Sequence, residues 1–394
     1  MSFYTFSSKS RPVIFISTLL ILLAVLAVIV WSTQYYFLKT GDLVSEEDAV
    51  NIQHSSGDLC LYDSLAANNH MAYKLALYDK FKPKVVVIGS SRVLQFGAPM
   101  FGAGFINMGR TMNYLLEGPA TFARLLEHGK PELILLGIDF WWFNPNYRIR
   151  WGQAKQLIRV QHDNPAMLKS LIKNSITHPQ FLGHASALFQ KASCHLGVAA
   201  KTYLNGFGPD GFRYHGAKMT LRSRPDKDRG FANTLKRIKK GKARFEHADA
   251  PDQKKMDRFM ALVETIRKAG IQLVIFMPPV APTIANAMEA SGKYAFILKI
   301  IAGLRRHGLM VHDFHMPDQL NLTDCNFLDG FHAGDVAAAR ILAHMAKTRP
   351  GLHKILNHEE LSRLSQFSNR AEVYYSEAFG KPETDFLGLG CVKS

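Results

Sequence analysis

Cysteine is scarce in this chain of 394 residues, and its spacing excludes one kind of metal site. The four cysteines form no Cys-x-x-Cys pair and stand far apart, at Cys60, Cys194, Cys325 and Cys391. A site built on cysteine thiolates needs such close pairs, so we expect neither a metal nor a cofactor. One or two disulfides would suit an oxidising compartment, whereas buried free thiols are the alternative, and the sequence does not choose a pairing.

Charged residues are absent from positions 12–31, which read PVIFISTLLILLAVLAVIVW. About 20 apolar residues cross a hydrocarbon core as a helix. Lys9 and Arg11 precede this stretch, whereas four acidic residues fall between positions 42 and 48. The positive-inside rule therefore predicts a single-pass anchor in the cytoplasmic (inner) membrane, with residues 1–11 in the cytoplasm and the rest in the periplasm or another extracytoplasmic space. A cleaved signal peptide is disfavoured, because its apolar core would span only about 7–15 residues and end in small residues.

Acidic residues are depleted between Arg148 and Arg244, where 4 Asp/Glu stand against 20 Lys/Arg. The difference, +16, equals the formal net charge of the whole chain, so the remainder is balanced. Clustered like charges repel one another unless a partner offsets them, which indicates an anionic partner such as lipid headgroups or an acidic polysaccharide. Nucleic acid is not expected in the inferred compartment. A basic face that is merely solvated remains the alternative.

The remaining pattern alternates apolar runs of strand length with amphipathic stretches of helix length. This alternation predicts an α/β fold in which a parallel sheet lies between two helical layers, α/β/α. The strand candidates are residues 84–88, 105–108, 133–138, 272–277 and 309–314, and the helix candidates are residues 115–128, 257–269, 285–307 and 335–347.

The same pattern sets the domain boundaries. After the anchor we expect a connector at 32–80 with a helix near 64–81, a sheet domain at 81–350, and a tail at 351–394 with an edge strand near 373–375. The alternation is lost at about 144–250, which we interpret as a basic, largely helical insertion. Its features are helical stretches at 153–160 and 166–174 and a glycine-rich turn at 205–212.

Two short motifs carry the candidate chemistry. Gly89-Ser90-Ser91-Arg92 follows the buried run at 84–88, and Asp329-Gly330-Phe331-His332 lies near the end of the sheet domain. A serine hydroxyl becomes a good nucleophile when an imidazole accepts its proton and a carboxylate orients that imidazole. We therefore predict Ser91 as the nucleophile, His332 as the base and Asp329 as its orienting carboxylate. An ordinary turn, or an anion-binding helix start without catalysis, is the alternative for the first motif.

The motifs resemble blocks one, two, three and five of the SGNH/GDSL hydrolase superfamily. Block two would be Asn107-Met108-Gly109 and block three Gly137-Ile138-Asp139-Phe140, and the resemblance covers about residues 80–350 apart from the insertion. It implies an oxyanion hole formed in part by the backbone N–H groups of Ser91 and Gly109. The N-terminal anchor makes the chain similar to the membrane-tethered DltD-like, AlgJ/AlgX-like and PatB-like proteins. Those proteins act with membrane-bound O-acyltransferases on envelope or extracellular polymers.

One position departs from the family pattern. Block three usually supplies an asparagine amide to the oxyanion hole, but the matching residue is Asp139, and an ionised aspartate donates no hydrogen bond. Either Asp139 turns away or is protonated, or Asn144 or another group substitutes for it, or catalysis is weak. The nearby aromatic run at 140–143 is interpreted as core or as a membrane-facing surface, with a sugar-stacking platform as the alternative.

The function expected from these features is an extracytoplasmic O-acyltransferase, most naturally an O-acetyltransferase. It would act on a cell-envelope or extracellular polysaccharide, with a multi-span membrane-bound O-acyltransferase as a partner. Two competing interpretations stay open. The first is a carbohydrate or lipid esterase with the same triad, and the second is a non-catalytic polymer-binding or scaffold subunit.

Overall fold

A five-stranded parallel sheet forms the centre of the computed structural model, which describes residues 10–65, 70–102, 104–148, 194–220 and 226–392. The strands are arranged in the order β2-β1-β3-β6-β7. Their bounds are β1 Val85–Gly89, β2 Phe105–Gly109, β3 Leu133–Gly137, β6 Gln272–Met277 and β7 Val311–Asp313. The α/β class predicted from the alternation of runs is confirmed.

The first strand, β1, lies at the point where the strand order reverses, since β2 pairs on one side of it and β3 on the other. Every residue of β1, β2 and β3 is buried, as expected for strands covered on both faces. Ligands of open parallel sheets bind beyond the carboxyl ends of the strands at such a reversal. The Gly-Ser-Ser-Arg motif begins with the last residue of β1, and so falls in that position.

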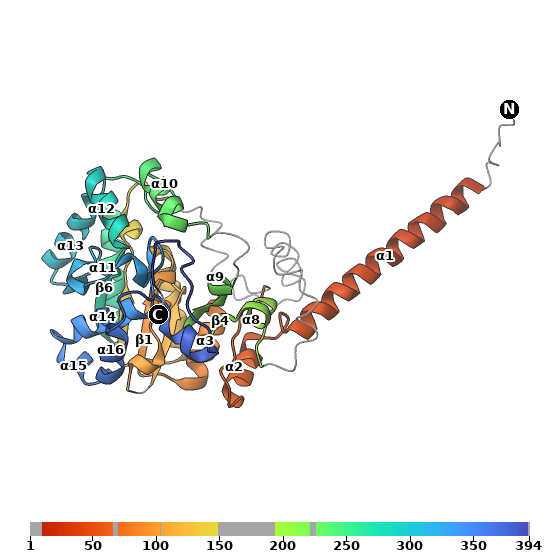
Figure 1. The fold of residues 1–394 in the computed structure, drawn as a ribbon, viewed down its shortest axis with the longest axis horizontal. Coiled ribbons are helices and arrows are strands. Elements are labelled where there is room, and N and C mark those ends of the chain that lie inside the picture. Colours follow the sequence, from red (N-terminus) through yellow and green to blue (C-terminus); the bar gives the residue numbers. More distant parts are fainter. Residues whose placement is uncertain (1–9, 66–69, 103, 149–193, 221–225, 393–394) are drawn as a thin grey trace.

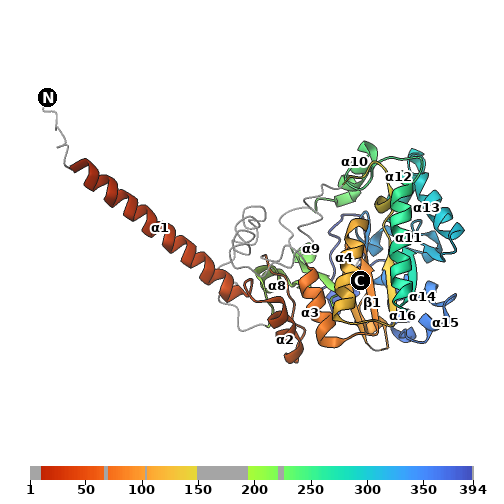
Figure 2. The ribbon, with the colours of Figure 1, turned by 180° about the vertical axis from the view of Figure 1, so that it is seen from behind.

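Helices cover both faces of the sheet. Helices α3, α4 and α11 lie over one face (Figure 2), and α14 and α16 lie over the other (Figure 1). The expected helix at 285–307 is instead two helices, because Gly292 ends the first of them in the left-handed region at φ 66°. The helices are α3 Met71–Phe81, α4 Gly118–His128, α11 Gln253–Lys268, α12 Pro282–Ser291, α13 Phe296–Arg306, α14 Asp335–Ala346 and α16 His358–Ser365.

Helix α1 (Ser10–Thr40) projects away from the globular body (Figure 1), and residues 12–40 are long and apolar enough to span a membrane. Its carboxyl end is bonded to the body. Gly197 donates its N–H to Thr40 O at 2.8 Å, and the buried Asp42 carboxylate accepts from the N–H groups of Leu65 and Val198. The connector contains a helix that we did not predict, α2 Glu46–Ser55.

The described part of the insertion contains a two-stranded ribbon as well as helices. A two-stranded antiparallel ribbon, β4 Asn205–Phe207 with β5 Arg213–His215, uses the glycine-rich turn. Around it are α8 Val198–Tyr203, α9 Gly216–Thr220 and α10 Ala232–Lys240. The expected helices at 153–160 and 166–174 lie outside the described residues. A disulfide between Cys60 and Cys194 joins the connector to this segment.

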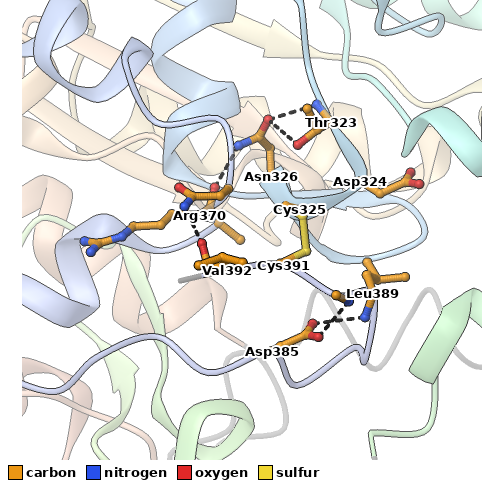
Figure 3. Close-up of a disulfide and its surroundings, with 12 residues drawn as sticks. Thr323, Asp324, Cys325, Asn326, Arg370, Asp385, Leu389, Cys391 and Val392 are labelled. Atoms are coloured by element: carbon orange, nitrogen blue, oxygen red, sulfur yellow. Dashed lines mark hydrogen bonds between the residues drawn. A yellow bond between two sulfur atoms is a disulfide. The ribbon is translucent and has the colours of Figure 1, made fainter. Parts of the chain in front are cut away.

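The C-terminal tail corrects one prediction. Residues 373–375 form no edge strand but begin helix α17 (Val373–Phe379), because the buried Asp335 carboxylate accepts the N–H groups of Val373 and Tyr374. A short helix, α15 Pro350–His353, precedes α16. A second disulfide, Cys325–Cys391, fastens the end of the tail beside the loop that leads to Asp329 (Figure 3).

Candidate functional site

Ser91 lies in a short 3₁₀ helix (Ser91–Val93) that begins directly after β1. The preceding residue, Ser90, caps this helix, because its side-chain oxygen accepts the N–H of Arg92 at 3.2 Å. Glycine is required at position 89 by close approach, since a Cβ there would stand 2.8 Å from the carbonyl oxygen of Gly137. No acceptor in the described part of the chain takes the Ser91 N–H, so this donor is left for a ligand.

Asp329 and His332 belong to a short hairpin formed by β8 Phe327–Asp329 and β9 His332–Ala333. The carboxylate of Asp329 accepts the backbone N–H groups of Phe331 and His332 at 3.0 and 2.9 Å, which fixes its orientation. Its two oxygens lie 2.9 and 2.8 Å from Nδ1 of His332. The imidazole is therefore held by its own turn, with Nε2 pointing away from the carboxylate.

The hydroxyl of Ser91 lies 2.7 Å from that Nε2 atom. Ser91, His332 and Asp329 are therefore linked in the order that a serine nucleophile, its base and its orienting carboxylate require. His332 and Asp329 have side chains that are each 20% exposed, so the base is reachable from solvent while the pair is largely shielded. The structure brings together the three residues that the motifs predicted.

The electrostatics of Asp329 favour its ionised form. Burial by itself raises the pKa of this carboxyl, but the positive charge and hydrogen bond of His332, with a smaller contribution from Lys218, lower it below the ordinary aspartate value. A carboxylate that stays ionised stabilises the imidazolium formed when His332 takes a proton.

Arg92 connects the serine turn to the other loops of the site. Its side chain is fully buried and donates to four oxygens, which belong to Phe331, Pro278, Pro279 and Asp139. Phe331 directly precedes the histidine, and Pro278 and Pro279 follow β6. Arg92 thus links the carboxyl ends of β1, β3 and β6 with the Asp329–His332 turn, so one buried side chain holds the turns of both Ser91 and His332.

Asp139 is the other half of this buried pair, and its carboxylate lies 3.1 Å from Nη1 of Arg92. Burial raises the pKa of Asp139, and the charge of Arg92 opposes that rise. The amide of Asn144, the substitute donor expected from the sequence, donates to Glu246 O. Oδ1 of Asp139 and the amide nitrogen of Asn144 are therefore both engaged with protein groups.

The N–H group of Gly109, an expected oxyanion donor, is already engaged in a hydrogen bond. Its N–H donates to the Asn107 side-chain oxygen at 2.7 Å, and the Asn107 amide in turn donates to Val93 O and Phe96 O. Beneath it, the fully buried Lys74 ammonium donates to Asn107 O and Gly211 O. Asn107 therefore braces the end of the Ser91 helix and engages the Gly109 N–H. Of the expected oxyanion donors, the Ser91 N–H is the one left open.

The insertion supports the hairpin from the other side. Asp228 is buried, and its carboxylate accepts the Gly330 N–H at 2.8 Å as well as the N–H and hydroxyl of Thr234 in α10. A side chain at Gly330 would collide with Thr234, because a Cβ would stand 2.7 Å from its methyl carbon. Gly330, the glycine of the second motif, is thus required by the packing of the hairpin against α10.

The aromatic run Phe140–Phe143 forms a short 3₁₀ helix whose four side chains are buried, which assigns it to the core. The indole N–H groups of Trp141 and Trp142 both donate to Asn113 O.

Comparison of the chain with protein-family models, with curated proteins and with solved structures gave no match. The candidate site therefore stands on its own geometry.

Three arginines near the site had no role assigned from the sequence. Arg92 was visible in the first motif, but its partners come from three distant loops. Arg237 and Arg244 were visible as members of the basic segment, and the structure places both against the Asp329–His332 turn. A charge count locates such a segment, whereas only the fold shows which of its cations face the cleft.

Proposed function

We propose that this protein is a serine-dependent acyl-transfer enzyme, an O-acyltransferase that acetylates a polysaccharide outside the cytoplasm. The observation that carries the proposal is the linked set Ser91–His332–Asp329, at the carboxyl end of the strand where the sheet order reverses. The resemblance of the motifs to the SGNH/GDSL superfamily supports the same chemistry. The membrane-tethered members of that superfamily suggest the polymer substrate.

The chemistry proceeds in two balanced half-reactions. The Ser91 oxygen attacks the carbonyl carbon of an acyl ester as its proton passes to Nε2 of His332. The resulting oxyanion accepts a hydrogen bond from the Ser91 N–H. Collapse of this intermediate breaks the ester bond, and the leaving alkoxide takes the proton from His332. A sugar hydroxyl then gives its proton to His332 and attacks the acyl-serine, which forms the new ester and restores Ser91.

The anchor and the disulfides support the proposed location. A helix apolar enough to cross a membrane precedes the sheet domain, and both disulfides suit an oxidising compartment. We propose a single-pass protein of the inner membrane, with its N-terminus in the cytoplasm and its catalytic domain in the periplasm. A multi-span acyltransferase in the same membrane would be the source of acyl groups.

The acceptor separates this proposal from its nearest rival, an esterase that uses the same triad with water. Purified full-length chain in detergent is given 4-nitrophenyl acetate with and without an oligosaccharide. Appearance of acetylated saccharide, at the expense of free acetate, supports the transferase. Free acetate alone, at a rate the saccharide does not change, assigns the protein as an esterase.

The Ser91→Ala variant is the control for both outcomes. Loss of acetyl transfer and of acetate release together shows that either product comes from this site. Unchanged acetylation of the polymer in Ser91→Ala or His332→Ala would contradict the proposed function. In that case a non-catalytic, polymer-binding role would be the better description.

A further inference from the structure

Two adjoining cavities open on the Asp329–His332 turn. Their volumes are about 870 and 650 Å³, and both are lined by Asn233, Arg237, Asp329 and Phe331. The smaller one is also lined by His332, so it reaches the base of the triad. A ligand held there lies directly beside the reacting groups.

The smaller cavity is strongly cationic. Lys236, Arg237, Lys242 and Arg244 line it, and its one lining carboxylate, Asp329, is already bonded to His332. Within the described residues, none of these four cations forms a salt bridge. Unpaired charges of one sign around a concave surface focus the field on an oppositely charged ligand.

Two of these cations are held in place by aromatic rings. The guanidinium carbon of Arg237 lies 5.5 Å from the centre of the Phe331 ring, and that of Arg244 lies 6.0 Å from Phe331 and 5.0 Å from Trp141. The Phe331 ring itself lies 4.2 Å from the His332 ring, centre to centre. A stacked guanidinium keeps its N–H edge available, and that edge matches the two oxygens of a carboxylate or phosphate.

The backbone that carries Arg244 is strained. Ala243 and Arg244 both adopt positive φ, at 56° and 81°, which residues with a side chain rarely do. Phe245 holds this loop in place, because its ring is buried and packs on Phe140 and Phe331. Strain retained by surrounding packing is typical of residues that clamp a ligand.

We propose that Arg237 and Arg244 bind an anionic group of the acceptor, so that the polymer modified by this protein is an acidic glycan. The carboxylate or phosphate of one sugar sits against the two arginines, and a nearby hydroxyl faces His332. This inference rests on the proposed function for its substrate class. The binding site itself is independent of turnover.

A direct binding measurement tests the site without catalysis. Full-length Ser91→Ala protein in detergent is titrated, by calorimetry, with an oligogalacturonate, a phosphorylated oligomannoside and a neutral malto-oligosaccharide of equal length. We expect the acidic sugars to bind more tightly than the neutral one. The tighter of the two acidic arms identifies carboxylate or phosphate as the natural group.

Variants then locate the interaction. Adding Arg237→Gln and Arg244→Gln should weaken binding of the acidic sugar by about tenfold to a hundredfold, because two charge-assisted contacts are lost. Lys239→Gln with Lys240→Gln is the matched control: it removes two charges from α10, the helix that carries Arg237, at exposed positions that line neither cavity. The arginine pair is required to weaken binding while the lysine pair does not.

Equal binding of acidic and neutral sugars, or equal weakening by the two pairs of substitutions, would overturn the proposal. Unchanged melting temperatures show that the arginine variants are folded. Arg244→Lys keeps the charge but not the planar group, so its affinity for the acidic sugar should lie between the affinities of the arginine pair and the lysine pair. Failure of this experiment is distinct from failure of the proposed function, because labelling of Ser91 by an active-site reagent does not depend on the glycan.

Discussion

The hydroxyl oxygen of Ser91 lies 2.7 Å from Nε2 of His332, although the two residues are 241 positions apart in the chain. Ser91 follows β1 of the central sheet, and His332 lies in the β8–β9 hairpin, which follows β7 in the chain. Arg92, next to the serine, donates to the carbonyl of Phe331, next to the histidine. Their distance is therefore fixed by a buried link as well as by the fold.

Removal of the orienting carboxylate should cost activity without unfolding the protein. In Asp329→Asn, the amide keeps the size of the side chain but no longer stabilises an imidazolium, so kcat for 4-nitrophenyl acetate should fall by about a thousandfold or more. The backbone N–H groups of Phe331 and His332 keep an oxygen acceptor. A steady-state assay measures the loss of activity. A melting temperature near that of the unchanged protein shows that the loss does not come from unfolding. Full activity would argue against Asp329 as the orienting group.

Arg92→Met should destabilise the fold by about 3–5 kcal/mol, because it leaves the Asp139 carboxylate buried without its partner. Chemical denaturation measures this change. The double variant Arg92→Met with Asp139→Leu should lose less than the single variant. A loss in the double variant equal to the sum of the losses in Arg92→Met and Asp139→Leu alone would show that the pair is not coupled.

Arg92→Lys separates the positioning role from the structural one. A lysine keeps the charge but cannot bond all four oxygens that the guanidinium contacts. We expect kcat to fall while KM for a small ester changes little, since the serine and histidine turns lose their common link. A rise in KM at constant kcat would assign Arg92 to substrate binding.

Glu117 should make stability depend on pH. Its carboxylate accepts the N–H groups of Asn113 and Tyr114, and burial raises its pKa from 4.5 to about 7. The folded chain therefore keeps this proton to a higher pH than the unfolded chain, and the free energy of unfolding should fall as pH rises from about 4.5 to about 7.

The matched variant isolates this group from other buried acids. Glu117→Gln retains an oxygen acceptor but does not titrate, so it should be more stable than the parent at pH 8 by roughly 3 kcal/mol at most and similar to it at pH 4. Denaturant unfolding at several pH values measures the difference. Parallel pH profiles for the two proteins would contradict the assignment.

The disulfide Cys325–Cys391 should stabilise the loop before Asp329. It closes 66 residues of chain, and its loss, as in Cys325→Ser with Cys391→Ser, should lower the free energy of unfolding by about 4 kcal/mol. In Figure 3 the neighbouring Asn326 side chain bonds Thr323 and Arg370, so the tail contributes to the same loop. If reduction leaves the melting temperature unchanged, the tail is not needed to hold that loop.

Local patterns predicted the sheet well. Strand β6 matches its predicted bounds, 272–277, because a glycine precedes it and two prolines follow it. Helix α2 was missed although its signal is local, since Ser45 caps it and three acidic residues fill its first turn. The two site motifs could also be predicted, because the first directly follows a buried apolar run and the second has the spacing of a short turn.

Long-range partners account for what was not predicted. Residues 373–375 have the composition of a strand, but Asp335, some 40 positions earlier, caps them as a helix. Oδ1 of the Asp139 carboxylate is bonded to Arg92, and Asn107 takes the Gly109 N–H, so two groups expected in an oxyanion hole have partners within the protein. No periodicity or motif reports such pairings.

Covalent labelling of Ser91 tests the central claim most directly. Full-length protein is treated with a fluorophosphonate, and the modified peptide is identified by mass spectrometry, with His332→Ala and Ser90→Ala treated in parallel. We predict a single adduct on Ser91 that is strongly slowed in His332→Ala and retained in Ser90→Ala. Absence of the adduct from the folded protein, or labelling at the same rate without the histidine, would contradict a serine nucleophile activated by His332.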